Sequence, residues 1–344
     1  MEKIKKFLAK KDVEISLSRY GIQALSAMAR GLFASLIIGL ILQVLGEQLN
    51  VNLLVEFSEI AQDMMGPAIG VAIAYGLNAP PLVIFASAIT GAAGASGVGV
   101  EGVLGGPVGA FLAAVIGAEL GKLVSKETKV DIIITPMTVI IVGSLVARFV
   151  GPGINSFMVA FGQIIINATE LHPISMGAIV STLMGMALTL PISSAAIGLM
   201  LELSGLAAGA ATVGCSAQMV GFATMSWKEN RWEGLISQGL GTSMLQMPNI
   251  INNPYIWIPP TITGAILGPM ATTVMQLENV AIASGMGTSG LVGQFGTVEA
   301  MGTEVIPQII LLHFILPAIL TLIIAKIMRK NNLIKENDLL LEEV

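Results

Sequence analysis

Basic residues are missing from most of this sequence. Only 17 of the 344 residues are lysine or arginine, and residues 31–121, 149–227 and 232–325 contain none. A cation at the centre of a lipid bilayer costs about 3 kcal/mol on insertion scales, so membrane proteins keep these residues in loops, mainly on the cytoplasmic side. This distribution is typical of a polytopic membrane protein.

Cysteine, histidine and charge in general are also scarce. The single cysteine, Cys215, excludes an internal disulfide and a cysteine-based metal site. Charged residues make up 11% of the chain, well below the roughly 25% of soluble domains, while hydrophobic residues make up 54%. There is no Walker loop for ATP, and neither histidine lies in a triad-like motif. We therefore expect no metal, no cofactor and no nucleic-acid partner.

The basic clusters predict the orientation of the chain. Residues 3–30, 122–129, 228–231 and 326–335 hold nearly all the lysines and arginines. The positive-inside rule places these groups, and both termini, on the cytoplasmic face of a bacterial cell membrane. We expect an amphipathic cytoplasmic segment at 1–30, a single transmembrane domain at 31–329 and a cytoplasmic tail at 330–344. A solvated N-terminal tail is the alternative for the first segment.

The apolar stretches indicate helices that are broken at membrane depth. Glycine and proline interrupt many of them, and such breaks are tolerated only where protein or a water-filled cavity satisfies the backbone. Semi-polar stretches at 49–65, 154–170 and 232–253 suit interfacial helices or re-entrant hairpins. The predicted fold is all-α and polytopic, with about 8–10 transmembrane helices. The clearest spans lie near 31–46, 103–121, 132–149, 174–190, 196–222, 255–275 and 306–328, with shorter pieces at 66–77 and 81–95.

Uncharged polar residues gather in the third stretch that lacks basic residues. Amides and hydroxyls donate and accept hydrogen bonds, as binding of a polyhydroxylated solute requires. On a backbone broken by glycine and proline, they predict a site for a neutral, sugar-like solute; an external loop rich in turn residues is the alternative. The candidate binding residues are Ser243, Gln246, Asn249, Asn252, Thr288 and Ser289, with Ser193 and Ser194 after Pro191.

Two acidic residues could couple transport to a proton or cation gradient. Glu101 lies in a glycine-rich run, and Glu202 lies within a predicted span. An ionisable residue inside a membrane is a default functional candidate, although each could instead be an interfacial or paired side chain.

Four segments resemble a known family in their order along the chain. They are residues 104–114 (LGGPVGAFLAA), residues 134–152 ending in VGP, residues 176–191 with MGAI and MALTLP, and residues 239–267 with Pro248 and Pro259. This succession resembles the membrane component EIIC of the bacterial phosphotransferase system, in its fructose-type superfamily. The chain is most similar to the stand-alone branch that includes perfringolysin-regulator-type proteins.

The resemblance implies a transport architecture and a set of partners. It implies a homodimer with a scaffold part and a mobile part that carries the solute by an elevator-like movement. It implies a small carbohydrate or related polar solute and a separate cytoplasmic phosphocarrier (IIB-like) chain. It also implies that residues 242–249 and 285–290 line the site.

Several positions depart from the fructose-type pattern. Met244 stands where an I-T-E-G-A-I-P-like motif carries an acid, and residues 285–290 lack the histidine of P-H-G-G. Residues 189–194 carry neither charge of a D-M-G-G-P-V-N-K run. The acid and histidine are expected to hold the sugar hydroxyl during phosphorylation, so we expect no catalytic residue of that kind here.

Three functions therefore compete. The leading one is an EIIC-like transporter of a small polar solute, with its coupling to phosphorylation open. The second is a membrane sensor or regulator that keeps the fold and the pocket. The third is an ion-coupled carrier that relies on Glu101 or Glu202.

Overall fold

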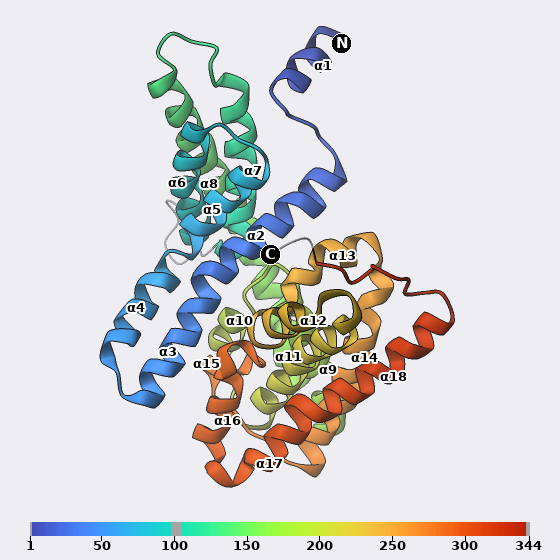
Figure 1. The fold of residues 1–344 in the computed structure, drawn as a ribbon. Helices are drawn as coiled ribbons and strands as arrows, with labels where there is room; N and C mark the ends of the chain where they lie inside the picture. The colour runs from blue at the N-terminus through green and yellow to red at the C-terminus, as the bar shows by residue number, and fades with distance from the viewer. Residues whose placement is uncertain (1, 98–104, 342–344) are drawn as a thin grey trace. The chain divides into compact units, whose positions relative to one another are not determined.

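The computed structural model describes residues 2–97 and 105–341, and all their regular structure is helical. The only strand-like feature in these residues is an isolated bridge between Gly205 and Asn279. The prediction of an all-α protein is confirmed. The helices of the chain form two compact units (Figure 1).

The first unit comprises residues up to Gly39 and Glu59–Phe157. Its complete helices are α1 (Glu2–Lys10), a π-helical turn (Ser18–Gln23), α2 (Ala24–Leu32), a second π-helical turn (Phe33–Ile37), α5 (Met65–Gly76), α6 (Pro81–Ser96) and α7 (Gly106–Val124). The first part of α8 (Asp131–Thr169) also belongs to it.

The second unit comprises Leu40–Ser58 and the chain from Met158 onward. It contains most of α3 (Ile38–Leu49) and α4 (Asn52–Asp63), and the end of α8. Its later α-helices are α9 (Pro173–Thr189), α10 (Ser194–Met200), α11 (Gly205–Met225), α12 (Trp227–Ile236), α13 (Met247–Asn252), α14 (Ile258–Pro269), α15 (Ala281–Ser284), α16 (Val292–Met301), α17 (Ile306–Ile309) and α18 (Leu316–Lys330). Short 3₁₀ and π-helical pieces join them at Ser237–Gly241, Ser243–Gln246, Pro254–Trp257, Met270–Val274, Ser289–Leu291, Thr303–Val305 and Ile310–Ile315.

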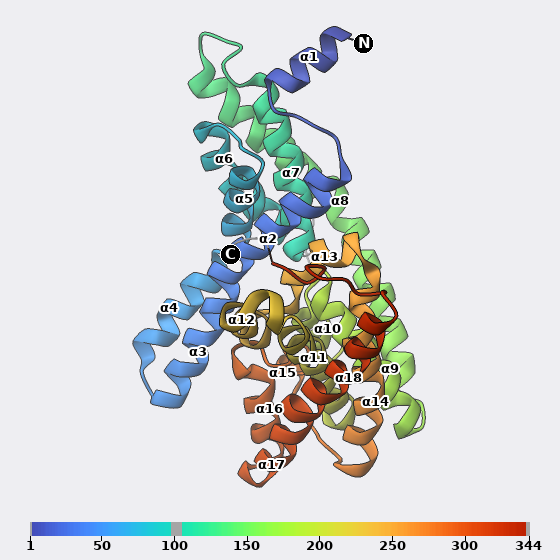
Figure 2. The same cartoon turned by 45° about the vertical axis from the view of Figure 1, so that its right-hand side comes forward.

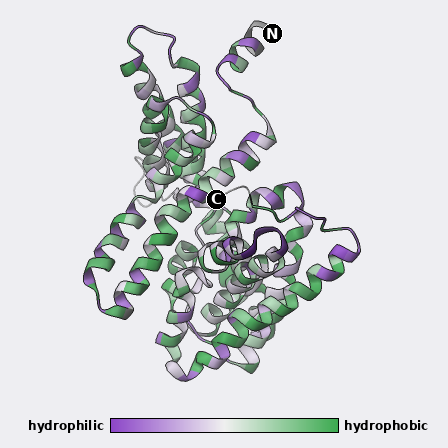
Figure 3. Cartoon of the chain, viewed as in Figure 1, coloured by the Kyte–Doolittle hydropathy of each residue, from purple (hydrophilic) through white to green (hydrophobic). Residues whose placement is uncertain are grey.

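Several helices are long and apolar enough to cross a membrane. In the described part of the chain there are five such continuous helical segments: Ser18–Glu47, Gly106–Val124, Asp131–Thr169, Gly205–Met225 and Thr303–Lys330. Helices α5, α6 and α9 are apolar but shorter. Figure 3 shows the hydropathy along these helices. The chain is thus an integral membrane protein, while the side on which each terminus lies stays a prediction.

Two predicted boundaries were wrong. The span expected at 132–149 continues as α8 to Thr169, with Pro152 inside the helix, so residues 154–170 are not a separate interfacial piece. The span expected at 196–222 is divided into α10 and α11, because Glu202 and Gly205 have positive φ angles of 50° and 57°. The continuous α8 and the divided pair α10 and α11 differ in backbone conformation, which a hydropathy profile does not reveal.

Close helix packing in the first unit depends on small residues. A Cβ atom on Gly94 of α6 would lie 2.3 Å from the carbonyl oxygen of Gly109 on α7. The reverse substitution would bring a Cβ on Gly109 to 2.2 Å from the oxygen of Gly94. Glycine therefore allows the two backbones to touch, as small residues do in many membrane helix pairs.

A buried charge network joins the N-terminal segment to α7. Glu119 accepts from Arg19 Nε at 3.3 Å and lies 3.3 Å from Lys122 Nζ. Arg19 Nη2 also donates to Asp12 Oδ2 at 2.8 Å, and both cations donate to the carbonyl oxygen of Leu77 at 2.9 Å. The Arg19 guanidinium holds the pKa of the Asp12 carboxyl below its usual value. Two cations and two anions thus balance each other in the network.

Helix α11 forms the centre of the second unit. It packs against α9, α14 and α18, which surround it in both views (Figures 1 and 2). Its side chains are nearly all buried, and alanine and glycine are its commonest residues, which allows its neighbours to approach closely. A cluster of buried apolar side chains, including Val213 of α11, Leu267 of α14 and Leu312, forms part of the core of this bundle. Any polar group on α11 must therefore find its partner inside the protein.

Candidate functional site

The one amide on α11 is the centre of a buried hydrogen-bond network. Gln218 is 1% exposed. Its Oε1 accepts from Thr189 Oγ1 at 3.2 Å and from Trp257 Nε1 at 3.1 Å. Its Nε2 donates to Thr261 Oγ1 at 3.0 Å. Gln218 therefore ties α11 to the end of α9 and to the start of α14.

Breaks in the chain bring the other members of this network together. Helix α9 ends at Thr189 because Leu190, which precedes Pro191, is extended with ψ 157°. Thr189 Oγ1 lies 2.8 Å from Ser243 Oγ, in the 3₁₀ turn Ser243–Gln246. The hydroxyl of Thr242 begins that turn by accepting from the Met244 amide at 3.1 Å. Thr189 and Ser243 are both 0% exposed, and because Thr189 donates its proton to Gln218, the Ser243 hydroxyl donates to Thr189.

A second chain of amides continues from the same turn. Gln246 Nε2 donates to Gln238 Oε1 at 2.9 Å, and Asn249 Nδ2 donates to Gln246 Oε1 at 2.8 Å. Gln238 in turn donates to Ser226 Oγ at 2.9 Å. Gln238 and Gln246 are fully buried, whereas Asn249 is half-buried.

The C-terminal tail, residues 333–341, lies on this amide chain. The carbonyl oxygen of Leu339 accepts from Gln246 Nε2 at 3.0 Å and from Asn230 Nδ2 at 2.7 Å, and that of Leu340 accepts from Asn249 Nδ2 at 2.9 Å. Leu339 is 0% exposed. Both views show the tail running from α18 past α13 (Figures 1 and 2). The tail backbone thus supplies acceptors to two of the predicted binding residues.

The second predicted polar segment packs against the first. Thr288 is fully buried and donates to the carbonyl oxygen of Gly239 at 2.5 Å. Ser194 donates to the carbonyl oxygen of Gly285 at 2.6 Å. A Cβ atom on Gly287 (φ +53°) would lie 2.7 Å from the backbone of Cys215, so this turn rests directly on α11.

The structure therefore brings some of the predicted residues together. Ser243, Gln246 and Asn249 lie on one short segment, and Thr288 touches the residues just before it. Ser289 is 2% exposed, and its hydroxyl has no partner among the described residues. Ser193 accepts from the amide of Ala196 and begins α10.

The remaining predicted residues lie elsewhere. Asn252 is exposed at the end of α13. Glu202 is exposed in the turn between α10 and α11, rather than inside a span as expected. Glu101 lies outside the described residues. No group of three or more histidine, cysteine, aspartate or glutamate side chains in the described ranges could hold a metal ion.

Sequence reasoning missed the centre of the network. Gln218, Trp257 and Thr261 are not among the candidates selected from the sequence. One signal was available: Gln218 is the only amide within an apolar helix of 21 residues. A polar side chain in that setting must be paired internally, so it marks a constrained position.

A second buried polar pair lies elsewhere in the same unit: Gln294 Nε2 and His313 Nδ1 are 3.0 Å apart.

Comparison with known proteins identifies a family. The model of the family described as "Phosphotransferase system, EIIC" matches residues 22–341. No curated protein and no solved structure matches the chain. The matched range includes most of both units and the Gln218 and Gln246 networks, and it begins after Asp12 and Arg19.

Proposed function

Because the chain belongs to the phosphotransferase-system EIIC family of sugar-transport membrane components, we propose that it carries a small neutral carbohydrate across the cell membrane. The supporting observation is the buried network of Gln218, Thr189 and Ser243, where α9 breaks. In transporters, discontinuous helices often frame the substrate site. Hydroxyls and amides without charge suit a neutral polyol better than an ion.

We propose that the solute takes its hydrogen bonds from the 3₁₀ turn and the amide chain. Gln246 and Asn249 would exchange the carbonyl oxygens of Leu339 and Leu340 for sugar hydroxyls. Binding then requires the tail to leave, because both amide groups already donate to it. A homodimer and a separate IIB-like carrier chain remain proposals that the family supports.

The next question is whether transport is coupled to phosphorylation of the solute. Met244 is 4% exposed at the position where the family resemblance expects an acid. A thioether neither removes a proton from a hydroxyl nor holds one by a strong hydrogen bond. We therefore propose transport in which this position does not assist phosphate transfer.

The experiment for this proposal is a ligand screen followed by uptake. Purified protein would be tested for thermal stabilisation by sugars, sugar alcohols, sugar phosphates and carboxylates. A ligand at about 100 times its Kd stabilises a single site by about 2.7 kcal/mol. A neutral sugar that stabilises the protein and is taken up by vesicles supports the proposal. Stabilisation by anions alone contradicts the neutral site.

Alanine at the polar turn should weaken binding of such a sugar. We expect Ser243→Ala and Gln246→Ala each to raise the Kd about fivefold to 150-fold, because a stranded buried partner costs about 1–3 kcal/mol. Isothermal titration of the sugar found in the screen measures this. Ser156→Ala is the matched control, since the Ser156 hydroxyl is exposed and bonds only to Pro152 of its own helix. Unchanged affinity in both variants would remove the turn from the site.

Releasing the tail should strengthen binding. A chain that ends at Asn332 lacks every described tail contact with Asn230, Gln246 and Asn249, so its amides no longer have to exchange partners. We expect the sugar Kd to fall about tenfold or more. The two hydrogen bonds to the tail, of about 1 kcal/mol each, no longer have to be broken before the sugar binds.

A point substitution separates this effect from general damage. Leu339→Ser removes a fully buried side chain and should also strengthen binding, whereas Leu340→Ser changes a side chain that is 46% exposed and should not. If the truncated chain stays monodisperse and binds the sugar no more tightly, the tail does not compete with the solute.

The tail contact also favours the regulator as a second function. A segment that leaves when solute binds would change the surface that the protein offers to a partner. In that case deletion of the gene should change transcription while uptake of the sugar stays normal. The reverse result supports transport.

A further inference from the structure

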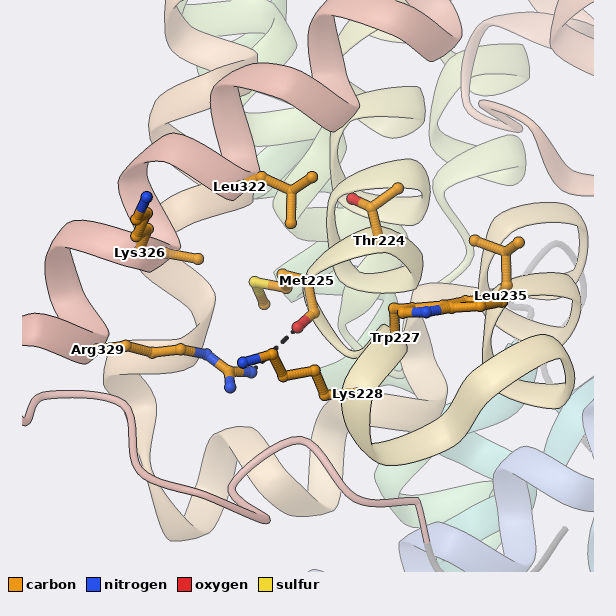
Figure 4. A pocket seen from close by; sticks show the side chains of 9 residues that line it. Thr224, Met225, Trp227, Lys228, Leu235, Leu322, Lys326 and Arg329 are labelled. Carbon is orange, nitrogen blue, oxygen red and sulfur yellow. Dashed lines mark hydrogen bonds between the residues drawn. The ribbon is translucent and has the colours of Figure 1, made fainter.

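An amphipathic cleft of about 630 Å³ opens between α11, α12 and α18. Figure 4 shows its walls: α18 supplies Leu322, Lys326 and Arg329, the end of α11 supplies Met225, and α12 supplies Trp227. Its volume lies within the range of small-molecule sites. The cleft belongs entirely to the second unit and is separate from the Gln218 network.

The cations that line the cleft are not all neutralised. Arg329 donates to Glu229 Oε1 at 2.9 Å and to the carbonyl oxygen of Met225 at 3.1 Å, so that arginine is paired. Lys228 and Lys326 are exposed, and neither makes an ion pair or hydrogen bond with a described residue. Two positive charges therefore remain at the mouth of the cleft.

The cleft lies where two membrane spans end. The candidate spans Gly205–Met225 and Thr303–Lys330 both finish at its basic rim. On α18, Ile319, Ile323 and Ile327 are about half exposed, so the helix presents an apolar surface beside the cleft. Trp227 stands at the same end, and tryptophan is enriched at the membrane interface. The apolar wall suits the acyl chain of a lipid, and the cationic rim suits an anionic head group.

We propose that this cleft binds one anionic phospholipid. Lys228 and Lys326 hold the phosphate diester, and an acyl chain lies along Leu322 and Met225 into the hydrocarbon region. Basic pockets between helices at the cytoplasmic end of spans suit acidic head groups. The apolar wall argues for a diacyl lipid over free phosphate, which would gain nothing from Leu322 or Trp227.

The test uses the full chain in mild detergent. Native mass spectrometry would compare retention of dioleoyl phosphatidylglycerol with that of dioleoyl phosphatidylcholine. We expect retention of phosphatidylglycerol alone. The variant Lys228→Gln/Lys326→Gln should bind phosphatidylglycerol about 25-fold more weakly. Each lysine near a membrane surface contributes a factor of about five, and the two factors multiply. Each lysine is exposed, so the substitutions leave the fold intact.

The matched control is Lys330→Gln. Lys330 lies on the same helix, is exposed and does not line the cleft, so its loss should leave retention unchanged. Equal weakening by this control would mean general surface attraction and would overturn the proposal, as would equal retention of both lipids. Displacement of the lipid by millimolar inorganic phosphate, or by polyglutamate, would assign the cleft to a free phosphate or to an acidic protein instead.

Discussion

Gly214→Ala should prevent α9 and α11 from packing in the second unit. A Cβ atom at position 214 would lie 1.9 Å from the carbonyl oxygen of Ser181 and 2.4 Å from its carbonyl carbon. These are backbone atoms, so relief requires α9 to move as a whole. Overpacking costs about 1–3 kcal/mol where side chains can yield, and we expect at least the upper end here. Thermal unfolding of the detergent-purified protein measures the loss.

The chain provides a matched control for this substitution on α14. A Cβ atom on Gly264 would lie 3.6 Å from Cα of Gly214, an ordinary van der Waals contact at the same helix junction. Gly264→Ala should therefore unfold close to the wild-type temperature. Similar melting temperatures for the two variants would show that α9 and α11 are not held as closely as described.

Neutralising Glu119 should strongly destabilise the first unit. Lys122, whose side chain is 1% exposed, would keep only Asp12 at 3.9 Å as a counter-charge. Breaking a buried charge pair by removing one partner costs about 3–5 kcal/mol, because the remaining charge stays desolvated. Glu119→Gln should thus lower the unfolding temperature strongly.

A double-mutant cycle identifies the cause. Glu119→Gln/Lys122→Gln removes one charge of each sign and restores the balance, so its loss of stability should be smaller than the sum of the single losses. Glu127→Gln is the control: the Glu127 side chain is 41% exposed, and Lys11, its partner, also donates to the carbonyl oxygen of Ser125, so this loss should be smaller. Additive losses in the cycle would contradict the network as a unit.

The sequence was informative about membrane insertion and class, and less so about where helices break. The stretches without lysine and arginine contain most of the apolar helical sequence, because insertion energy acts on composition; α8, which contains Arg148, is the main exception. The division at Glu202 and the continuity of α8 past Pro152 depend on φ and ψ at single residues. A continuous helix and a helix broken in the middle can have the same hydropathy profile, so hydropathy does not predict where the break lies.

The sequence also predicted one part of the candidate site and missed another. Ser243, Gln246 and Asn249 could be selected because they are close in sequence and polar in an apolar context. Gln218 could not be joined to Thr189 and Trp257, since 29 and 39 residues separate them and only packing brings them together. The tail was predicted as a cytoplasmic segment, and its contacts with the amides have no sequence signature.

The tail also imposes an order on biosynthesis. Gln246 precedes Leu339 by 93 residues, so its side-chain amide leaves the ribosome well before the carbonyl that accepts from it. At about 5–20 residues per second, the delay is roughly 5–20 s. During that interval a nascent chain holds its polar turn without its final partner. The contact between Gln246 and Leu339 therefore forms only after the rest of the polar turn has been made.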